Sequence, residues 1–211
     1  MRWLTLYLRS RRVPAALAGA AAGIAVMWVL GAATSDSAPG RTMVVLTVLL
    51  LTGVLTATLG GPDEELDRTA ALPWAPRRIA HLLAAVTVVA GLPLLTQLTP
   101  TGFGPAGLVI RDAAGLLGLT ALSAPLLGAG RAWFAPLGWT LAATIYPAAG
   151  QVLGQMLTWQ TQAPGNVPAA VTAATLACGG LIAYAVAGPA RHERSDAATV
   201  VMARAWRGQA G

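Results

Sequence analysis

The chain has 211 residues, of which 55% are hydrophobic and only 10% are charged. This composition, with a mean hydropathy of +0.63, excludes an ordinary water-soluble domain and indicates an integral membrane protein. The net charge is +6, but the sequence offers no basic, water-soluble face on which a nucleic acid could bind. We therefore expect anionic lipid to be the counter-charge and expect no nucleic-acid partner.

The N-terminal segment, residues 1–12, has the pattern of an amphipathic helix. Trp3, Leu4, Tyr7 and Leu8 share one helical face, and arginines occupy the other side. We expect this segment to lie along the inner membrane surface; a frayed basic leader is the alternative. Because five more apolar runs follow the first, we expect the first run to be an uncleaved anchor and not a signal peptide.

Six apolar runs, each about 18 to 24 residues long, have the length needed to cross a hydrocarbon core of about 30 Å. The sequence therefore predicts an all-α integral membrane protein with six transmembrane helices in a single domain, residues 13–188, followed by a cytoplasmic tail, residues 189–211. The predicted spans are Val13–Ala33, Thr42–Leu59, Ile79–Leu98, Leu108–Leu127, Trp133–Leu153 and Val167–Ala187.

The arginines predict the orientation of these spans, because basic residues are retained on the cytoplasmic side. If the chain crosses the membrane six times, twelve of its 14 arginines lie on one side of the membrane, and only Arg41 and Arg111 lie on the other. We therefore expect both termini, and the charged insert between spans two and three, to be cytoplasmic.

That insert and the start of span three read GPDEELDRTAALPWAPRRIAHLL from Gly61 to Leu83. Pro62 suits a first helical turn, the acids that follow complement a positive helix start, and Pro73 cannot continue the helix. The insert thus predicts a short amphipathic helix at the membrane surface, suited to being held by a partner. An ordinary solvated loop with an interfacial Trp74 is an equally acceptable interpretation.

Arg111 and Asp112 are charges at the outer end of the fourth run, where charges are costly and are usually paired or functional. Neighbouring positions on a helix do not face one another, so we expect each to find a partner on another span. Two interpretations compete: an outer gate or substrate contact, and a polar cap that snorkels to the interface. We prefer the cap.

Between the last two spans, Pro147 interrupts the fifth run and a glutamine-rich segment follows, residues 150–168. Irregular backbone at membrane depth must be buried in protein or line water. The segment predicts a broken or re-entrant helix at the outer surface, with Gln151 and Gln155 as candidate contacts on the substrate path. An interfacial loop without a role fits equally well.

Several kinds of chemistry are excluded by residues that the chain lacks. It has no lysine, so a phosphate-binding loop ending in GK[ST] is impossible. Its single cysteine, Cys178, lies in an apolar run, which we interpret as packing. The predicted spans contain almost no ionisable residues, and the chain has no GxSxG elbow or HExxH motif, so we expect neither enzymatic activity nor a bound metal or cofactor.

Four predicted features occur together in this chain: a basic amphipathic start, six spans with cytoplasmic ends, a charged helix between spans two and three, and a broken segment between spans five and six. In this combination the chain resembles the type-2 ABC transporter permeases. The text LDRTAALPWAPRRIAHLL looks like the loop between the second and third spans of that family. The absence of lysine and the abundance of Ala, Gly and Arg are similar to proteins of high-GC actinobacteria, which implies a bacterial plasma membrane.

The resemblance implies that residues 63–74 form a coupling helix seated in a groove of a separate ATPase subunit, which would bind ATP and Mg. It also implies a second permease chain and the export of a hydrophobic or amphipathic molecule. The alternative is a non-transporting membrane subunit, such as a sensor or an assembly partner. The residues assigned to coupling in this way are Asp63, Glu64, Glu65, Leu66, Asp67, Arg68, Trp74, Arg77 and Arg78.

Overall fold

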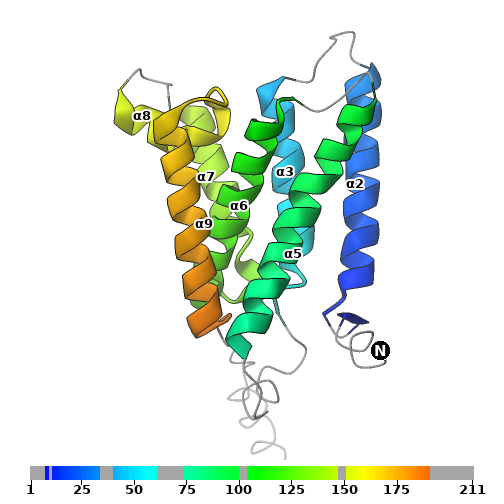
Figure 1. Cartoon of the computed structure of the whole chain (residues 1–211), viewed down its shortest axis with the longest axis vertical. Helices are drawn as coiled ribbons and strands as arrows, with labels where there is room; N and C mark the ends of the chain where they lie inside the picture. The colour runs from blue at the N-terminus through cyan, green and yellow to red at the C-terminus, as the bar shows by residue number, and fades with distance from the viewer. Residues whose placement is uncertain are drawn as a thin grey trace, which may run out of the picture.

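The computed structural model describes residues 8–9, 11–33, 40–60, 74–99, 104–146 and 151–190. Within these residues the secondary structure is entirely helical, as predicted. The longer helices run roughly parallel to one another (Figure 1). Their bounds are α2 Val13–Ala33, α3 Arg41–Thr56, α5 Trp74–Leu95, α6 Ala106–Leu127, α7 Phe134–Ile145, α8 Val152–Leu157 and α9 Val167–Ala187, with short 3-10 turns η1 Thr96–Leu98, η2 Ala129–Arg131 and η3 Trp159–Thr161.

Four of these helices are long and apolar enough to cross a membrane: α2, the α5–η1 unit, α6 and α9. They correspond to the predicted first, third, fourth and sixth spans. Helix α3 matches the second predicted span in position, but its 16 residues cover only about 24 Å. A turn ends it, in which the Thr58 amide donates to the Leu55 carbonyl.

The fifth predicted span, Trp133–Leu153, is wrong as a continuous helix. Helix α7 ends at Ile145 after 12 residues, and α8 is a separate helix of six residues. Tyr146 is extended, with ψ of 122°, as expected of a residue that precedes a proline. The extended conformation that a proline imposes on the residue before it therefore ends α7 and divides this run into two helices.

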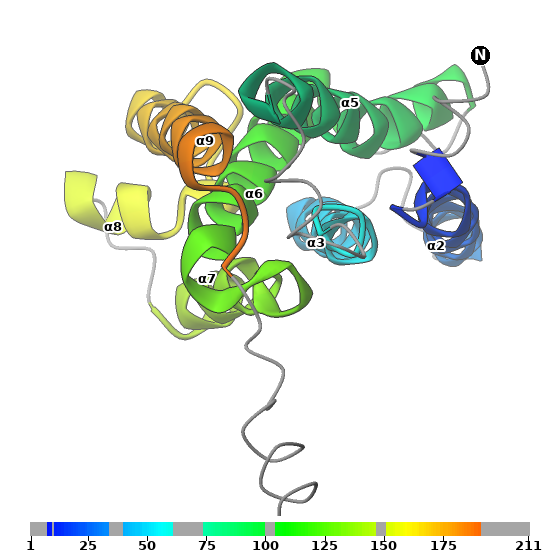
Figure 2. The ribbon, with the colours of Figure 1, turned by 90° about the horizontal axis from the view of Figure 1, so that it is seen from below.

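Helix α6 is the centre of the bundle. Seen from below, it is surrounded by α3, α5, α7 and α9, whereas α2 lies at the edge beside α3 (Figure 2). Most of the apolar window of α6 is buried, and its leucines Leu108, Leu116 and Leu117 are fully enclosed. Charges on this helix are therefore held inside protein and not in lipid.

The closest helix pair is α6 and α9, because glycines bring their backbones together. A Cβ added at Gly118 would lie 2.5 Å from the Cα of Ala177, and one added at Gly180 would overlap the Gly118 carbonyl. Small residues permit this kind of approach between membrane helices. The pair therefore forms a tightly packed unit that extends from one end of the bundle to the other.

Candidate functional site

Two polar clusters stand out at opposite ends of the bundle. The first, which we call the outer cluster, is centred on Arg111 and Asp112 in α6. Their relative exposures are 8% and 0%, and Arg111 Nε donates to Asp112 Oδ1 over 3.1 Å. The prediction that neighbours on one helix would not pair is wrong, because the long arginine side chain folds back onto the adjacent carboxylate.

The Arg111 guanidinium also reaches the connection between α8 and α9. It donates to the carbonyl of Gln160 over 3.1 Å, to that of Gln162 over 3.0 Å and to that of Ala163 over 3.0 Å. The backbone of this connection is irregular, and Gln160 is buried, so its carbonyl needs a donor. Arg111 therefore attaches this connection to α6, and Asp112 supplies the counter-charge.

This arrangement bears on one of the two interpretations of the pair, the snorkelling cap. Arg111 is buried and bonded to protein carbonyls, so a cap that snorkels to the interface does not describe the structure. The gate or substrate contact stays a prediction.

A tryptophan completes the outer cluster. Trp159 is fully buried, and its ring lies against Gly115, where an added Cβ would overlap it. Three groups of this cluster have buried polar atoms with no hydrogen-bond partner: Asp112 Oδ2, Trp159 Nε1 and both amide atoms of Gln160. The cluster thus combines a balanced ion pair with polar atoms that are able to hydrogen-bond a further group.

The glutamines chosen from the sequence are not the ones that contact Arg111. Gln151 is exposed just before α8, and Gln155 Oε1 accepts from Asn166 Nδ2 over 3.0 Å. Gln160 and Gln162 contact Arg111 instead. The density of glutamines in an apolar context pointed to the segment, but only the tertiary fold identifies which of them meet the arginine.

The second cluster, the inner hub, lies at the other end of the bundle, beside the charged insert. Its centre is the carbonyl of Leu59, which accepts from Arg11 Nη1 over 3.2 Å and from the Tyr184 hydroxyl over 2.6 Å. In the same turn, Thr58 Oγ1 lies 3.0 Å from His81 Nε2. The hub therefore joins the N-terminal segment, the turn after α3, α5 and α9, through residues Arg11, Thr58, Leu59, His81 and Tyr184.

The predicted coupling residues divide into two groups. Trp74, Arg77 and Arg78 lie in the first turns of α5, so Trp74 belongs to this helix and not to the helix predicted in the insert. Arg77 Cζ lies 5.3 Å from the centroid of the Trp74 ring, in cation–π contact. The other predicted coupling residues lie outside the described residues, as does most of the predicted N-terminal amphipathic helix. These coupling residues are Asp63, Glu64, Glu65, Leu66, Asp67 and Arg68.

Arg78 links α5 to the end of α9. It donates to the Ala185 carbonyl over 3.4 Å, and it packs against Gly188, where an added Cβ would lie 2.6 Å from its Cζ. Gly188 has φ of 69°, a left-handed conformation that favours glycine and ends α9. The start of α5 and the end of α9 are thus held together next to the insert.

Comparisons with models of protein families, with curated proteins and with solved structures found no match. Within the described ranges, no group of three or more His, Cys, Asp or Glu side chains is arranged to hold a metal ion. A functional interpretation therefore depends on the two polar clusters and on the patterns in the amino-acid sequence.

Proposed function

We propose that this chain is the membrane-spanning permease subunit of an ATP-driven exporter in a bacterial plasma membrane. In this proposal the chain crosses the membrane six times, with α3 as the second crossing and α7 together with α8 as the fifth. Both termini and the insert lie on the cytoplasmic side. A separate ATPase subunit binds ATP and Mg, and a second permease chain completes the path for a hydrophobic or amphipathic molecule.

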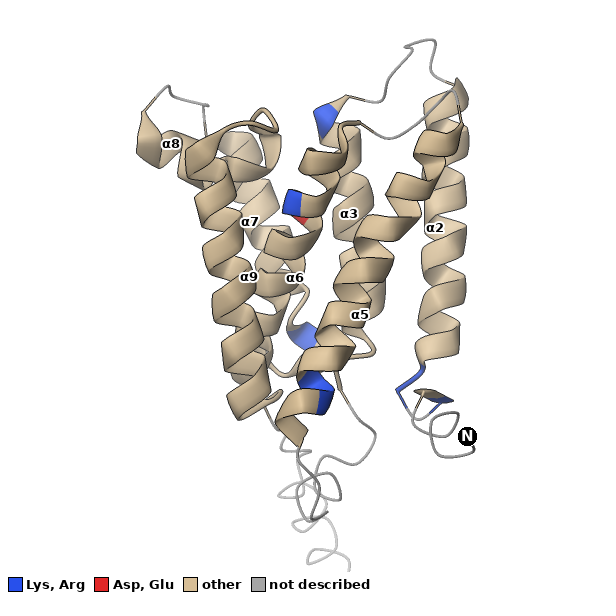
Figure 3. Ribbon diagram, viewed as in Figure 1, with Lys and Arg blue, Asp and Glu red and all other residues tan. Residues whose placement is uncertain are grey.

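The orientation is supported by the distribution of the arginines. Six of the eight described arginines belong to segments at the end of the bundle where α2 and α5 begin and α6 ends. The other two, Arg41 and Arg111, belong to the opposite end, where α3 and α6 begin (Figure 3). By the positive-inside rule, the first end faces the cytoplasm.

The observation that carries the proposal is the position of the inner hub. Leu59, whose carbonyl receives Arg11 and Tyr184, precedes the charged insert by two residues, and Trp74 follows the insert directly. If a bound partner displaces the insert, the displacement is therefore transmitted to the N-terminal segment, α5 and α9 together. Such a junction is suited to converting movement of a bound ATPase into movement of helices.

Helix α9 connects this junction to the outer cluster. Its inner end carries Tyr184, its outer end begins just after the connection held by Arg111, and its length packs against α6. A displacement at the insert is therefore transmitted along a packed helix pair to the outer cluster. The outer cluster would then act as the gate, since moving α9 relative to α6 strains the bonds between Arg111 and the three carbonyls.

The test asks whether a neighbouring reading frame encodes a P-loop ATPase, and whether that ATPase co-purifies with this chain in detergent. We expect the wild-type chain to retain the ATPase, and a variant combining Glu65→Ala, Asp67→Ala and Arg68→Ala to lose it while remaining monodisperse. The matched control removes two acids and one arginine from the tail, Glu193→Ala, Asp196→Ala and Arg194→Ala, and should retain the ATPase. Failure of the wild-type chain to bind would favour a non-transporting membrane subunit.

A further inference from the structure

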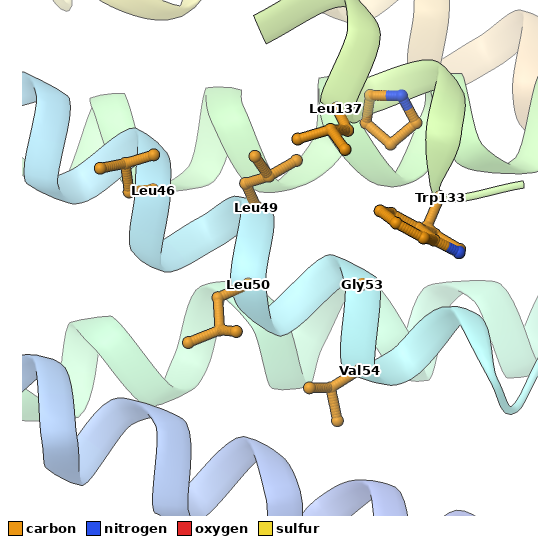
Figure 4. A pocket seen from close by; sticks show the side chains of 8 residues that line it. Leu46, Leu49, Leu50, Gly53, Val54, Trp133 and Leu137 are labelled. Carbon is orange, nitrogen blue, oxygen red and sulfur yellow. The ribbon is translucent and has the colours of Figure 1, made fainter. Parts of the chain in front are cut away.

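An apolar groove lies between α3 and the start of α7, with a volume of about 480 Å³. Figure 4 shows its walls, with leucines of α3 on one side and Trp133 and Leu137 on the other. The full lining is Leu46, Leu49, Leu50, Gly53, Val54, Trp133, Pro136 and Leu137. No charged side chain contributes to these walls, and the volume is comparable with that of one long lipid acyl chain.

A glycine keeps the groove open. Gly53 lies near the inner end of the wall formed by α3, and no heavy atom lies within 4 Å of a Cβ built on it. A glycine inside a helix costs about 1 kcal/mol relative to alanine, yet no close helix contact requires this one. Its effect is on the free space, which a larger side chain at this position would fill without a clash.

The segment that leads into the α7 wall of the groove carries a charge. Beyond Val54 and Trp133, the two walls meet where an added Cβ at Gly60 would lie 2.9 Å from the Cβ of Ala129. Arg131 follows in the same turn, two residues before Trp133, and is exposed. Asp112 is the sole acidic residue in the described ranges and is paired with Arg111, so no described carboxylate neutralises Arg131.

We propose that this groove binds an anionic phospholipid, with one acyl chain along α3 and the phosphate at Arg131. An arginine pairs with a phosphate in a planar, bidentate geometry, and tryptophans prefer the headgroup level, where Trp133 would lie beside the glycerol region. The inner leaflet supplies anionic lipid, which attracts basic groups close to its surface.

A second copy of the chain fits the groove less well. Stable protein interfaces bury about 800 Å² on each partner, more than a groove lined by eight residues offers, and the partner would have to cover Arg131. Among the described residues, a second copy offers no exposed acid to pair with Arg131, since Asp112 is buried in α6. A lipid phosphate supplies an anionic partner for Arg131 directly.

The experiment is native mass spectrometry of the purified full chain, with phosphatidylglycerol and phosphatidylcholine of identical acyl chains added in turn. We expect one phosphatidylglycerol to be retained in preference to phosphatidylcholine. Arg131→Gln should reduce retention of phosphatidylglycerol by about fivefold, the effect of one basic group near a lipid surface, and leave phosphatidylcholine unchanged. Arg41→Gln, an exposed arginine at the other end of α3, is the charge control and should retain both lipids as the wild type does.

A second pair of variants tests the groove itself. Gly53→Phe should fill it and abolish retention of both lipids, whereas Gly179→Phe adds the same side chain on α9, where space is also free, and should have no effect. Equal retention of the two lipids by wild type and Arg131→Gln would overturn the proposal in favour of general annular lipid. Unchanged lipid retention by Gly53→Phe, with a loss of dimer, would overturn it in favour of a second copy. The proposal takes the orientation of the chain from the proposed function, but none of these readouts involves the ATPase, so the failure of one is distinguishable from the failure of the other.

Discussion

Removing the Arg111 side chain tests how the outer cluster is held together. Arg111→Ala deletes four hydrogen bonds, one to Asp112 and three to the carbonyls of Gln160, Gln162 and Ala163. At about 0.6 kcal/mol for a typical hydrogen bond in a membrane protein, the bonds account for about 2 kcal/mol. The uncompensated carboxylate of Asp112 raises the expected loss to about 3–5 kcal/mol.

The assay is the free energy of unfolding in mixed micelles titrated with a denaturing detergent, together with hydrogen exchange of the amides in residues 158–166. We expect the single variant to lose stability and to exchange faster in this segment. A double variant, Arg111→Met with Asp112→Leu, removes both charges and should recover much of the stability, because replacing a buried ion pair by apolar residues is often neutral. Equal stabilities of wild type and Arg111→Ala, or a double variant less stable than the single one, would refute the reasoning.

Two further substitutions have matched controls within the same chain. Gly180→Ala forces a Cβ onto the backbone of α6 and should lower the unfolding free energy by about 1–3 kcal/mol through overpacking. Gly179→Ala meets open space and should leave the unfolding free energy nearly unchanged. Equal unfolding free energies for the two variants would contradict the close approach of α6 and α9. Tyr184→Phe removes the hydroxyl that donates to the turn after α3 and should lower the unfolding free energy by about 1 kcal/mol, whereas Tyr146→Phe alters an exposed ring and should not. A loss with Tyr146→Phe as large as that with Tyr184→Phe would argue against the inner hub.

Where the sequence predicted the fold well, local signals were sufficient. The first and last apolar runs match α2 and α9 residue for residue, because charged residues, prolines or glycines bound both runs. Asn166 is a typical helix-capping residue, and its side chain accepts from the Ala169 amide at the start of α9. Hydropathy identifies such segments because a membrane helix satisfies its own backbone.

The outer cluster shows where local signals end. Arg111 and Gln160 are separated by 49 positions, and which carbonyls an arginine reaches depends on how α6 and α9 pack. The sequence identified Arg111 and Asp112 as costly charges, but the helix rule that neighbours diverge ignored the length of the arginine side chain. The break between α7 and α8 is a local proline effect, and the sequence indicated it, because Pro147 interrupts the fifth apolar run.

The most direct test of the proposed permease function is photo-crosslinking in living cells with a photoreactive amino acid at position 67, in the charged insert. The same residue at position 38, in the predicted outer link between the first two spans, serves as the control. We predict an adduct between position 67 and the proposed P-loop ATPase subunit, and none from position 38. An ATPase adduct from position 38, or none from position 67 in a chain that is present and folded, would contradict the proposed orientation and partner.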